Sequence, residues 1–250
     1  MTGRVIALLV LTANGCGGRE APTGPTSPTA IPRSISILVF SKTEGFRHDS
    51  IPAGIAAIQQ QGQQRGLAVT ASEDAGIFTE EGLAAYRAVV FLSTTGDVLT
   101  VPQQAAFEQF VRRGGGFVGV HAAADTEYGW AFYGGLVGAY FSDHPAIQTA
   151  TIHIEDAGHP STASLPSAWV RRDEWYNFRH NPRGAVTVLA TLDERTYSGG
   201  TMHDHPIMWA QTYEGGRAWY TAGGHTIESF AEPLFVDHLG RAILWAAGAI

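Results

Sequence analysis

From residue 35 onward, short apolar runs alternate with amphipathic segments. Residues 35–40 and 88–92 are almost entirely apolar and rich in β-branched and aromatic side chains, which predicts two buried strands. Between them, residues 51–65 carry isoleucines at helical spacing, and residues 67–71 return to a strand pattern. Such alternation predicts parallel strands joined by right-handed helical crossovers. The first half of the chain therefore indicates an α/β fold.

The same pattern extends to the end of the chain, with a change in character after the middle. We expect a short helix at 80–86, a helix that starts with the capping box Thr100 to Gln103 and ends near Arg113, and a buried strand at 117–120. The second half is more β-like, with expected strands at 148–155, 186–191, 206–213 and 218–221 and a closing helix at about 233–247. We therefore expect one domain over residues 35–250, a mostly parallel sheet flanked by helices with β-rich additions in its second half.

The first 34 residues have a different composition. An apolar run at residues 5–11 follows Arg4; it is too short to span a bilayer but has the length of a signal-peptide core. Ala13-Asn14-Gly15-Cys16 resembles a bacterial lipobox, in which Cys16 would be acylated. The alternative is an ordinary export signal with an incidental cysteine. We expect a signal peptide at 1–16, a Gly/Pro/Ser/Thr-rich linker at 17–34, and a secreted protein, periplasmic or at the cell surface, held to the membrane only by a lipid anchor.

Charge and cysteine content exclude several classes of function. The formal net charge of the 250 residues is −7, and no basic stripe is present, so nucleic acid is not an expected partner. Cys16 is the only cysteine, which excludes an internal disulfide and a cysteine-based zinc cluster. It also leaves the expected folded domain without a catalytic thiol.

A histidine stands where related architectures place a nucleophile. His121 follows the expected strand 117–120 and is surrounded by small residues, Gly119 and 122–124, which suit a tight strand-to-helix elbow. No Gly-x-Ser-x-Gly motif occurs in the chain. An imidazole at this position can act as a general base, a general acid or a metal ligand.

Other chemically capable side chains lie in loops. Parallel sheets bring the loops at the carboxyl ends of their strands together, here 41–50, 93–100 and 121–130. Five loop histidines next to Gly, Pro or Asp are site candidates: His48, His121, His144, His205 and His225. The alternative for each is a hydrogen-bonded loop residue. Asp125, four residues after His121, can orient that imidazole, share a metal with it, or cap a helix.

Acidic and aromatic side chains occur together at residues 173–176. Asp173 and Glu174 precede Trp175 and Tyr176, a combination expected where sugar rings stack and their hydroxyl groups are held. Trp130 can extend this aromatic surface. The alternative is that these rings pack the edge of the sheet, because large aromatic side chains are often part of the core.

Eight motifs together resemble the ThuA-like family in content and order. They are 42–48, 114–121, 124–126, 144–145, 173–176, 204–206, 215–217 and 220–226. The resemblance covers about residues 35–248. It implies a flavodoxin-like fold of the class I glutamine amidotransferase type and an association with the use of disaccharides, trehalose especially, through 3-keto sugars.

Two hypotheses of function follow. The preferred one is an extracytoplasmic enzyme of carbohydrate catabolism, a hydrolase or lyase acting on a 3-ketoglycoside; the missing thiol excludes glutamine amidotransfer. Its expected catalytic residues are His121, His48, Asp125 and Glu174, and its expected contacts to a small carbohydrate are Arg47, Trp130, His144, Asp173 and Tyr176. A divalent metal, zinc or manganese, is expected on some of His121, Asp125, His205 and His225. The alternative is a non-catalytic carbohydrate-binding or accessory lipoprotein.

Overall fold

The computed structural model describes residues 1–3, 5, 8–9, 11 and 35–250. The chain divides into two units, Met1–Arg33 and Ser34–Ile250, and the second contains all of the secondary structure discussed below. The expected linker and the lipobox with Cys16 lie outside the described residues. Among the residues that are described, no helix combines the length and the apolar character needed to cross a membrane.

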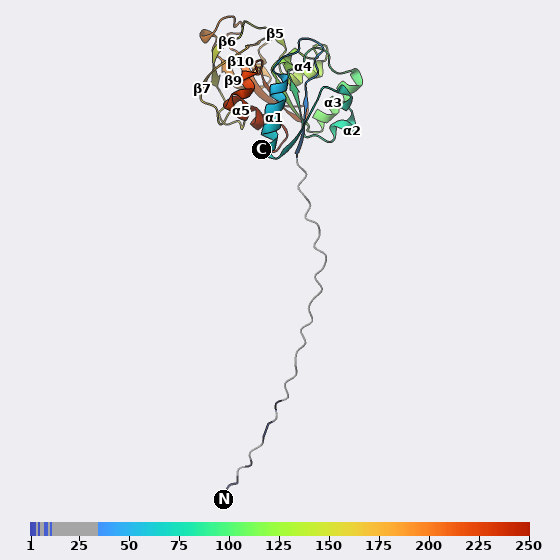
Figure 1. The fold of residues 1–250 in the computed structure, drawn as a ribbon, viewed down its shortest axis with the longest axis vertical. Helices are drawn as coiled ribbons and strands as arrows, with labels where there is room; N and C mark the ends of the chain where they lie inside the picture. Colours follow the sequence, from blue (N-terminus) through green and yellow to red (C-terminus); the bar gives the residue numbers. More distant parts are fainter. Residues whose placement is uncertain (4, 6–7, 10, 12–34) are drawn as a thin grey trace. The chain divides into compact units, whose positions relative to one another are not determined.

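A nine-stranded mixed sheet forms the centre of the second unit (Figure 1), in the order β2-β1-β3-β4-β11-β10-β9-β6-β7. Its parallel half consists of β1 (Ile35–Phe40), β2 (Leu67–Ser72), β3 (Ala88–Leu92), β4 (Gly116–Val120) and β11 (Gly216–Thr221). Its antiparallel half consists of β10 (Pro206–Tyr213), β9 (Thr187–Leu192), β6 (Gln148–Ile154) and β7 (Ala168–Asp173). This arrangement confirms the predicted α/β fold with β-rich additions in the second half.

Helices cover the sheet. The long ones are α1 (Ile51–Arg65), α3 (Val101–Arg112) and α5 (Pro233–Ala246), close to the predicted ranges, and the short ones are α2 (Glu80–Leu83) and α4 (Ala131–Val137). Helices α1 and α5 pack against each other, as do α2 and α3 (Figure 1). The chain passes closely beneath α5 at Gly116, where a Cβ atom would come within 2.2 Å of the Ala246 carbonyl oxygen. Glycine is therefore required for this contact.

Several elements were not expected from the sequence. They are β7, α4 and the small sheet of β5 (Phe141–Asp143) with β8 (Asn177–Phe178). Short 3₁₀ turns lie at Ala75–Ile77, His121–Asp125, Pro182–Gly184, Glu194–Thr196 and Glu228–Ala231. The elbow after β4 is one of these turns, so Asp125 does not belong to an α-helix that starts at His121.

The core sits against the parallel strands. All residues of β3 and β4 are buried, and Phe91 of β3 contacts Phe107 of α3 and Phe117 of β4 with ring centroids 5.3 and 5.5 Å apart. Burial of such rings contributes about 1.5–3 kcal/mol each to the free energy of unfolding. The strands that end at the candidate site are therefore firmly held.

Candidate functional site

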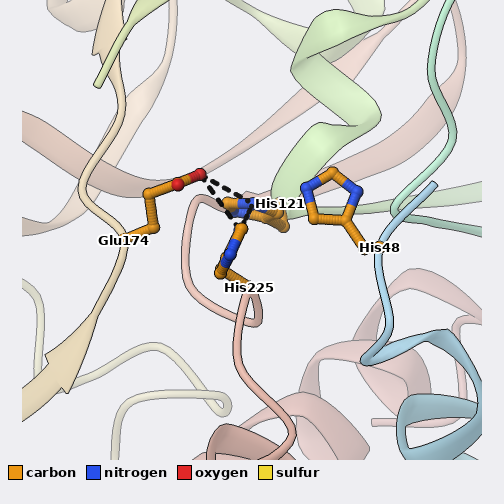
Figure 2. Close-up of side chains that lie close together, drawn as sticks. All are labelled: His48, His121, Glu174 and His225. Carbon is orange, nitrogen blue, oxygen red and sulfur yellow. Dashed lines mark hydrogen bonds and ion pairs between the residues drawn. The ribbon is translucent and has the colours of Figure 1, made fainter. Parts of the chain in front are cut away.

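Four polar side chains from four separate segments meet at one end of the sheet. They are His48 from the loop between β1 and α1, His121 after β4, Glu174 after β7 and His225 after β11. One ligand atom from each lies within 4.8 Å of the others, and Figure 2 shows Glu174 and His48 approaching the other two histidines from opposite sides. His48, His121 and Glu174 are buried and His225 is partly buried.

The orientation of His121 is fixed by the strands around it. Val120 of β4 pairs with Thr221 of β11, so the next residues, His121 and Ala222, lie side by side. The Nδ1 atom of His121 is 2.7 Å from the Ala222 carbonyl oxygen; it therefore carries the proton and donates. The φ of His121 is 51°, a left-handed conformation that costs a non-glycine residue about 1–3 kcal/mol. The Nε2 atom, on the other side of the ring, faces the cluster.

Three of the ligand atoms form a small triangle. The distances are 3.1 Å from His121 Nε2 to His225 Nδ1, 3.4 Å from His121 Nε2 to Glu174 Oε2, and 3.0 Å from His225 Nδ1 to Glu174 Oε2. Metal–ligand bonds of about 2.0–2.2 Å in tetrahedral geometry place ligand atoms roughly 3.3–3.6 Å apart. The triangle therefore needs only small adjustments to hold one divalent ion, with an open position as in catalytic sites.

The charges in this cluster favour a cation. Burial alone would raise the pKa of Glu174, but hydrogen bonds from His121 and His225 lower this pKa to about 2. Burial opposes protonation of His225, whereas the hydrogen bond to Glu174 outweighs it and raises the pKa of His225. The carboxylate is therefore ionised throughout the neutral range.

His48 completes the cluster without a hydrogen-bond partner at its Nδ1 atom. Its ring lies edge-on to those of His121 and His225, with centroids 4.8 and 5.0 Å away. Burial and the neighbouring His121 and His225 lower the pKa of His48 to about 3, so the imidazole is neutral at neutral pH. The Ser50 hydroxyl donates to the Gly224 carbonyl oxygen at 3.1 Å and ties this loop to the turn that carries His225.

A cavity of about 450 Å³ opens over the cluster. It is lined by Phe46, His48, Asp125, Phe141, His144, Glu174, Tyr176 and His225. His144 Nδ1 lies 3.0 Å from Oε1 of Glu174, the oxygen that does not take part in the triangle, and the Tyr128 hydroxyl donates to Asp125 at 2.6 Å. A second cavity of about 220 Å³ shares Phe46, His48 and His225 with the first. The cluster thus has direct access to a ligand-sized space.

Most of the site residues expected from the sequence are brought together here. His48, His121, Asp125 and Glu174, expected to be catalytic, all lie in or beside the cluster, as do His144, Tyr176 and His225. The group that could hold a metal also contains Glu174 and His48, neither of which was expected from the sequence to be a metal ligand. The two-strand β5–β8 sheet, which was not expected, supplies Phe141 to the wall of the cavity.

Four expected site residues lie elsewhere. Both ring nitrogens of His205 are engaged, Nε2 at 2.8 Å from the Tyr176 carbonyl oxygen and Nδ1 at 2.8 Å from Glu194, so we remove His205 from the metal ligands. Trp130 is buried and donates to Glu108 at 2.9 Å, which fits the packing alternative.

The other two have partners within the protein. Arg47 is half-exposed and paired with Glu73 at 2.6 Å, and it does not line either cavity over the cluster. Asp173 is fully buried, and its carboxylate accepts hydrogen bonds from Arg171, Gly224 and Ser229. Neither residue lines a cavity over the cluster.

Comparison with known proteins agrees with this fold. The family model of ThuA, described as trehalose utilisation, matches residues 36–246. The chain therefore belongs to the ThuA family, a flavodoxin-like α/β fold of the class I glutamine amidotransferase type. No curated protein matches the sequence.

Two solved structures of similar fold are described as ThuA-like proteins. One, from Bacteroides uniformis ATCC 8492, is 24% identical with a TM-score of 0.74; the alignment covers 88% of this chain and 95% of that one. The other, from Parabacteroides merdae ATCC 43184, is 19% identical with a TM-score of 0.71, covering 87% and 91%. At these identities the likeness establishes the fold alone.

The ligand triangle predicts stoichiometric metal uptake. Protein purified without chelator and dialysed against zinc or manganese should contain about one ion per chain by elemental analysis. Glu174→Gln and His225→Ala should each weaken metal binding by about 100-fold or more, because each removes a ligand. His153→Asn, at a half-exposed histidine on β6, is the matched control and should keep the wild-type content. Equal metal content in the wild type and in Glu174→Gln would show that the triangle is not the metal-binding site.

Proposed function

We propose that this protein is an enzyme of carbohydrate catabolism that acts on a 3-ketoglycoside by metal-assisted acid/base chemistry. One observation carries the proposal: the neutral imidazole of His48, whose Nδ1 atom has no hydrogen-bond partner, lies beside the His121–Glu174–His225 triangle, and His48, Glu174 and His225 line one cavity. A base and an electrophilic centre are what proton removal beside a ketone requires.

The cavity walls support an uncharged, hydroxylated ligand. Phe141 and Tyr176 supply aromatic surface, while Asp125 and His144 supply hydrogen-bonding groups. Neither cavity over the cluster is lined by a lysine or arginine, which argues against a phosphorylated sugar. The smaller cavity beyond Phe46 gives room for the second part of a disaccharide.

The reaction divides into a proton transfer and a bond cleavage. A bound zinc or manganese ion would supply Lewis-acid polarisation of the ketone oxygen. His48 removes the proton from the carbon between the ketone and the anomeric carbon. The electron pair left there forms a double bond to the anomeric carbon, whose bond to the leaving oxygen breaks, and His144 lies on the cavity wall where it can protonate the departing alcohol. Subsequent addition of water to the double bond makes the net reaction a hydrolysis.

This assignment separates the role of His48 from that of the ligands. His48→Gln should keep the wild-type metal content and lower the turnover number on the 3-keto form of trehalose by about 10²–10⁴-fold, because it removes only the base. Turnover is measured by release of free glucose, and metal by elemental analysis of the same sample.

Glu174→Gln provides the contrast, because it should lose metal and turnover together. Loss of metal from His48→Gln would show that His48 is a fourth ligand and would contradict its role as the base. Release of glucose from unoxidised trehalose at the same rate would contradict the requirement for a ketone.

The proposal includes a location outside the cytoplasm, with Cys16 as the site of lipid attachment. It is supported by the apolar run after Arg4 and by the lipobox-like residues 13–16. Full-length protein expressed in a bacterium fed with an alkyne fatty acid should incorporate the label and fractionate with membranes. Cys16→Ser should incorporate none; labelling of Cys16→Ser equal to that of the wild type would reject the anchor.

A further inference from the structure

A second carboxylate lies directly behind the cluster. Asp173, the last residue of β7, is fully buried, and it immediately precedes Glu174. Its Oδ1 atom accepts the backbone N–H groups of Glu174 at 3.0 Å and His225 at 3.2 Å. Its Oδ2 atom accepts the N–H of Gly224 at 2.8 Å. One carboxylate therefore holds the backbone of two residues that supply the ligand triangle.

The turn that carries His225 is shaped to wrap around this carboxylate. Gly224 has φ of 110°, a conformation that L side chains rarely adopt. A Cβ atom on Gly223 would come within 2.7 Å of Nη1 of Arg171 and 3.4 Å of Oδ2 of Asp173. Successive N–H groups directed at one anion form a backbone nest, here occupied by a side chain of the same protein.

The negative charge of Asp173 is compensated within the protein. Arg171, whose side chain is 2% exposed, donates to Oδ2 of Asp173 at 2.8 Å and to Glu232 at 2.9 Å. The Ser229 hydroxyl donates to the same Oδ2 atom at 2.9 Å. A buried charge is costly unless it is paired and hydrogen-bonded, and these contacts meet that condition.

We propose that Asp173 is a positioning residue, which sets the 3.0 Å separation between Glu174 Oε2 and His225 Nδ1 and thereby the affinity of the cluster for a divalent ion. This inference rests on the metal centre of the proposed function. Asp173 lines neither cavity, so it acts through the two ligands and not on substrate. The sequence led us to expect that Asp173 contacts a carbohydrate, and we propose this positioning role in place of that contact.

The test compares two isosteric substitutions. Asp173→Asn replaces one carboxylate oxygen by a donor, which cannot accept from the N–H groups that face it. The matched control is Asp237→Asn on α5, because Asp237, like Asp173, accepts from arginine and serine side chains, here Arg65, Arg241 and Ser164. Each variant is titrated with zinc chloride by competition with a chromophoric chelator, at a temperature where its near-ultraviolet circular dichroism matches that of the wild type.

Asp173→Asn should raise the zinc dissociation constant about 10–100-fold, the range typical of outer-shell partners, whereas Asp237→Asn should leave it unchanged. If Asp173→Asn does not fold, Ser229→Ala, which removes only one donor to Asp173, should raise the constant by a smaller factor. A folded Asp173→Asn with the wild-type constant, or an unchanged Ser229→Ala where Asp173→Asn fails to fold, overturns the proposal.

Imidazole ¹⁵N spectra of the zinc-free protein separate this inference from the proposed function. The hydrogen-bonded Nδ1 signal of His225 should be lost in Asp173→Asn and kept in Asp237→Asn. If wild type takes up no zinc, the metal-assisted function fails, and the spectra then decide whether Asp173 positions His225. An unchanged His225 signal in Asp173→Asn would reject the positioning role.

Discussion

The architecture of the site depends on one interaction: the carboxylate of Glu174 held against the imidazoles of His121 and His225, largely out of water. An ionised carboxylate in such surroundings is costly unless partners surround it, and the contacts of 3.0 and 3.4 Å supply them. A cluster of this kind adds little to fold stability, since replacing buried polar groups by apolar ones is often neutral or favourable. Its position beside a ligand-sized cavity is better explained by chemistry.

The sheet makes this interaction possible. Because β4 and β11 are parallel neighbours, their carboxyl ends deliver His121 and the turn of His225 to the same place, and β1 delivers the loop of His48. Glu174 comes from β7, the last strand in the sheet order, and its backbone is joined to the β11 turn through Asp173. The two halves of the sheet are thus coupled where the four side chains meet.

Much of this arrangement could be predicted from the sequence. The apolar runs of β1, β3 and β4 indicated the parallel half, and the loops after parallel strands pointed to His48 and His121. His225 was a candidate because it follows Gly224 in a loop. The ligand role of Glu174 could not be predicted in this way. Strand β7 reads AWVRRD, and two of its three buried side chains, Arg171 and Asp173, are charged, so its sequence does not alternate between apolar and polar residues. No spacing rule indicates which of Asp173 and Glu174 faces the cavity.

Two residues expected at the site, His205 and Trp130, lie away from the cluster because other parts of the protein bind their side chains. His205 precedes β10 and resembles the other loop histidines in sequence, but Glu194 and the Tyr176 carbonyl take both of its nitrogens. Trp130 has the composition of a sugar platform, yet a stacking contact to Tyr133 and a hydrogen bond to Glu108 hold it in the core. The hydrogen-bond partners of His205 and Trp130 lie 11, 29 and 22 residues away in the sequence, where no short motif contains them.

The most direct test of the central claim is anomalous diffraction from crystals of the zinc-treated protein, measured on both sides of the zinc absorption edge. Zinc held by the triangle should give one strong peak about 2.0–2.2 Å from His121 Nε2, His225 Nδ1 and Glu174 Oε2, open toward the cavity. Zinc-loaded crystals with no peak inside this triangle would contradict that claim.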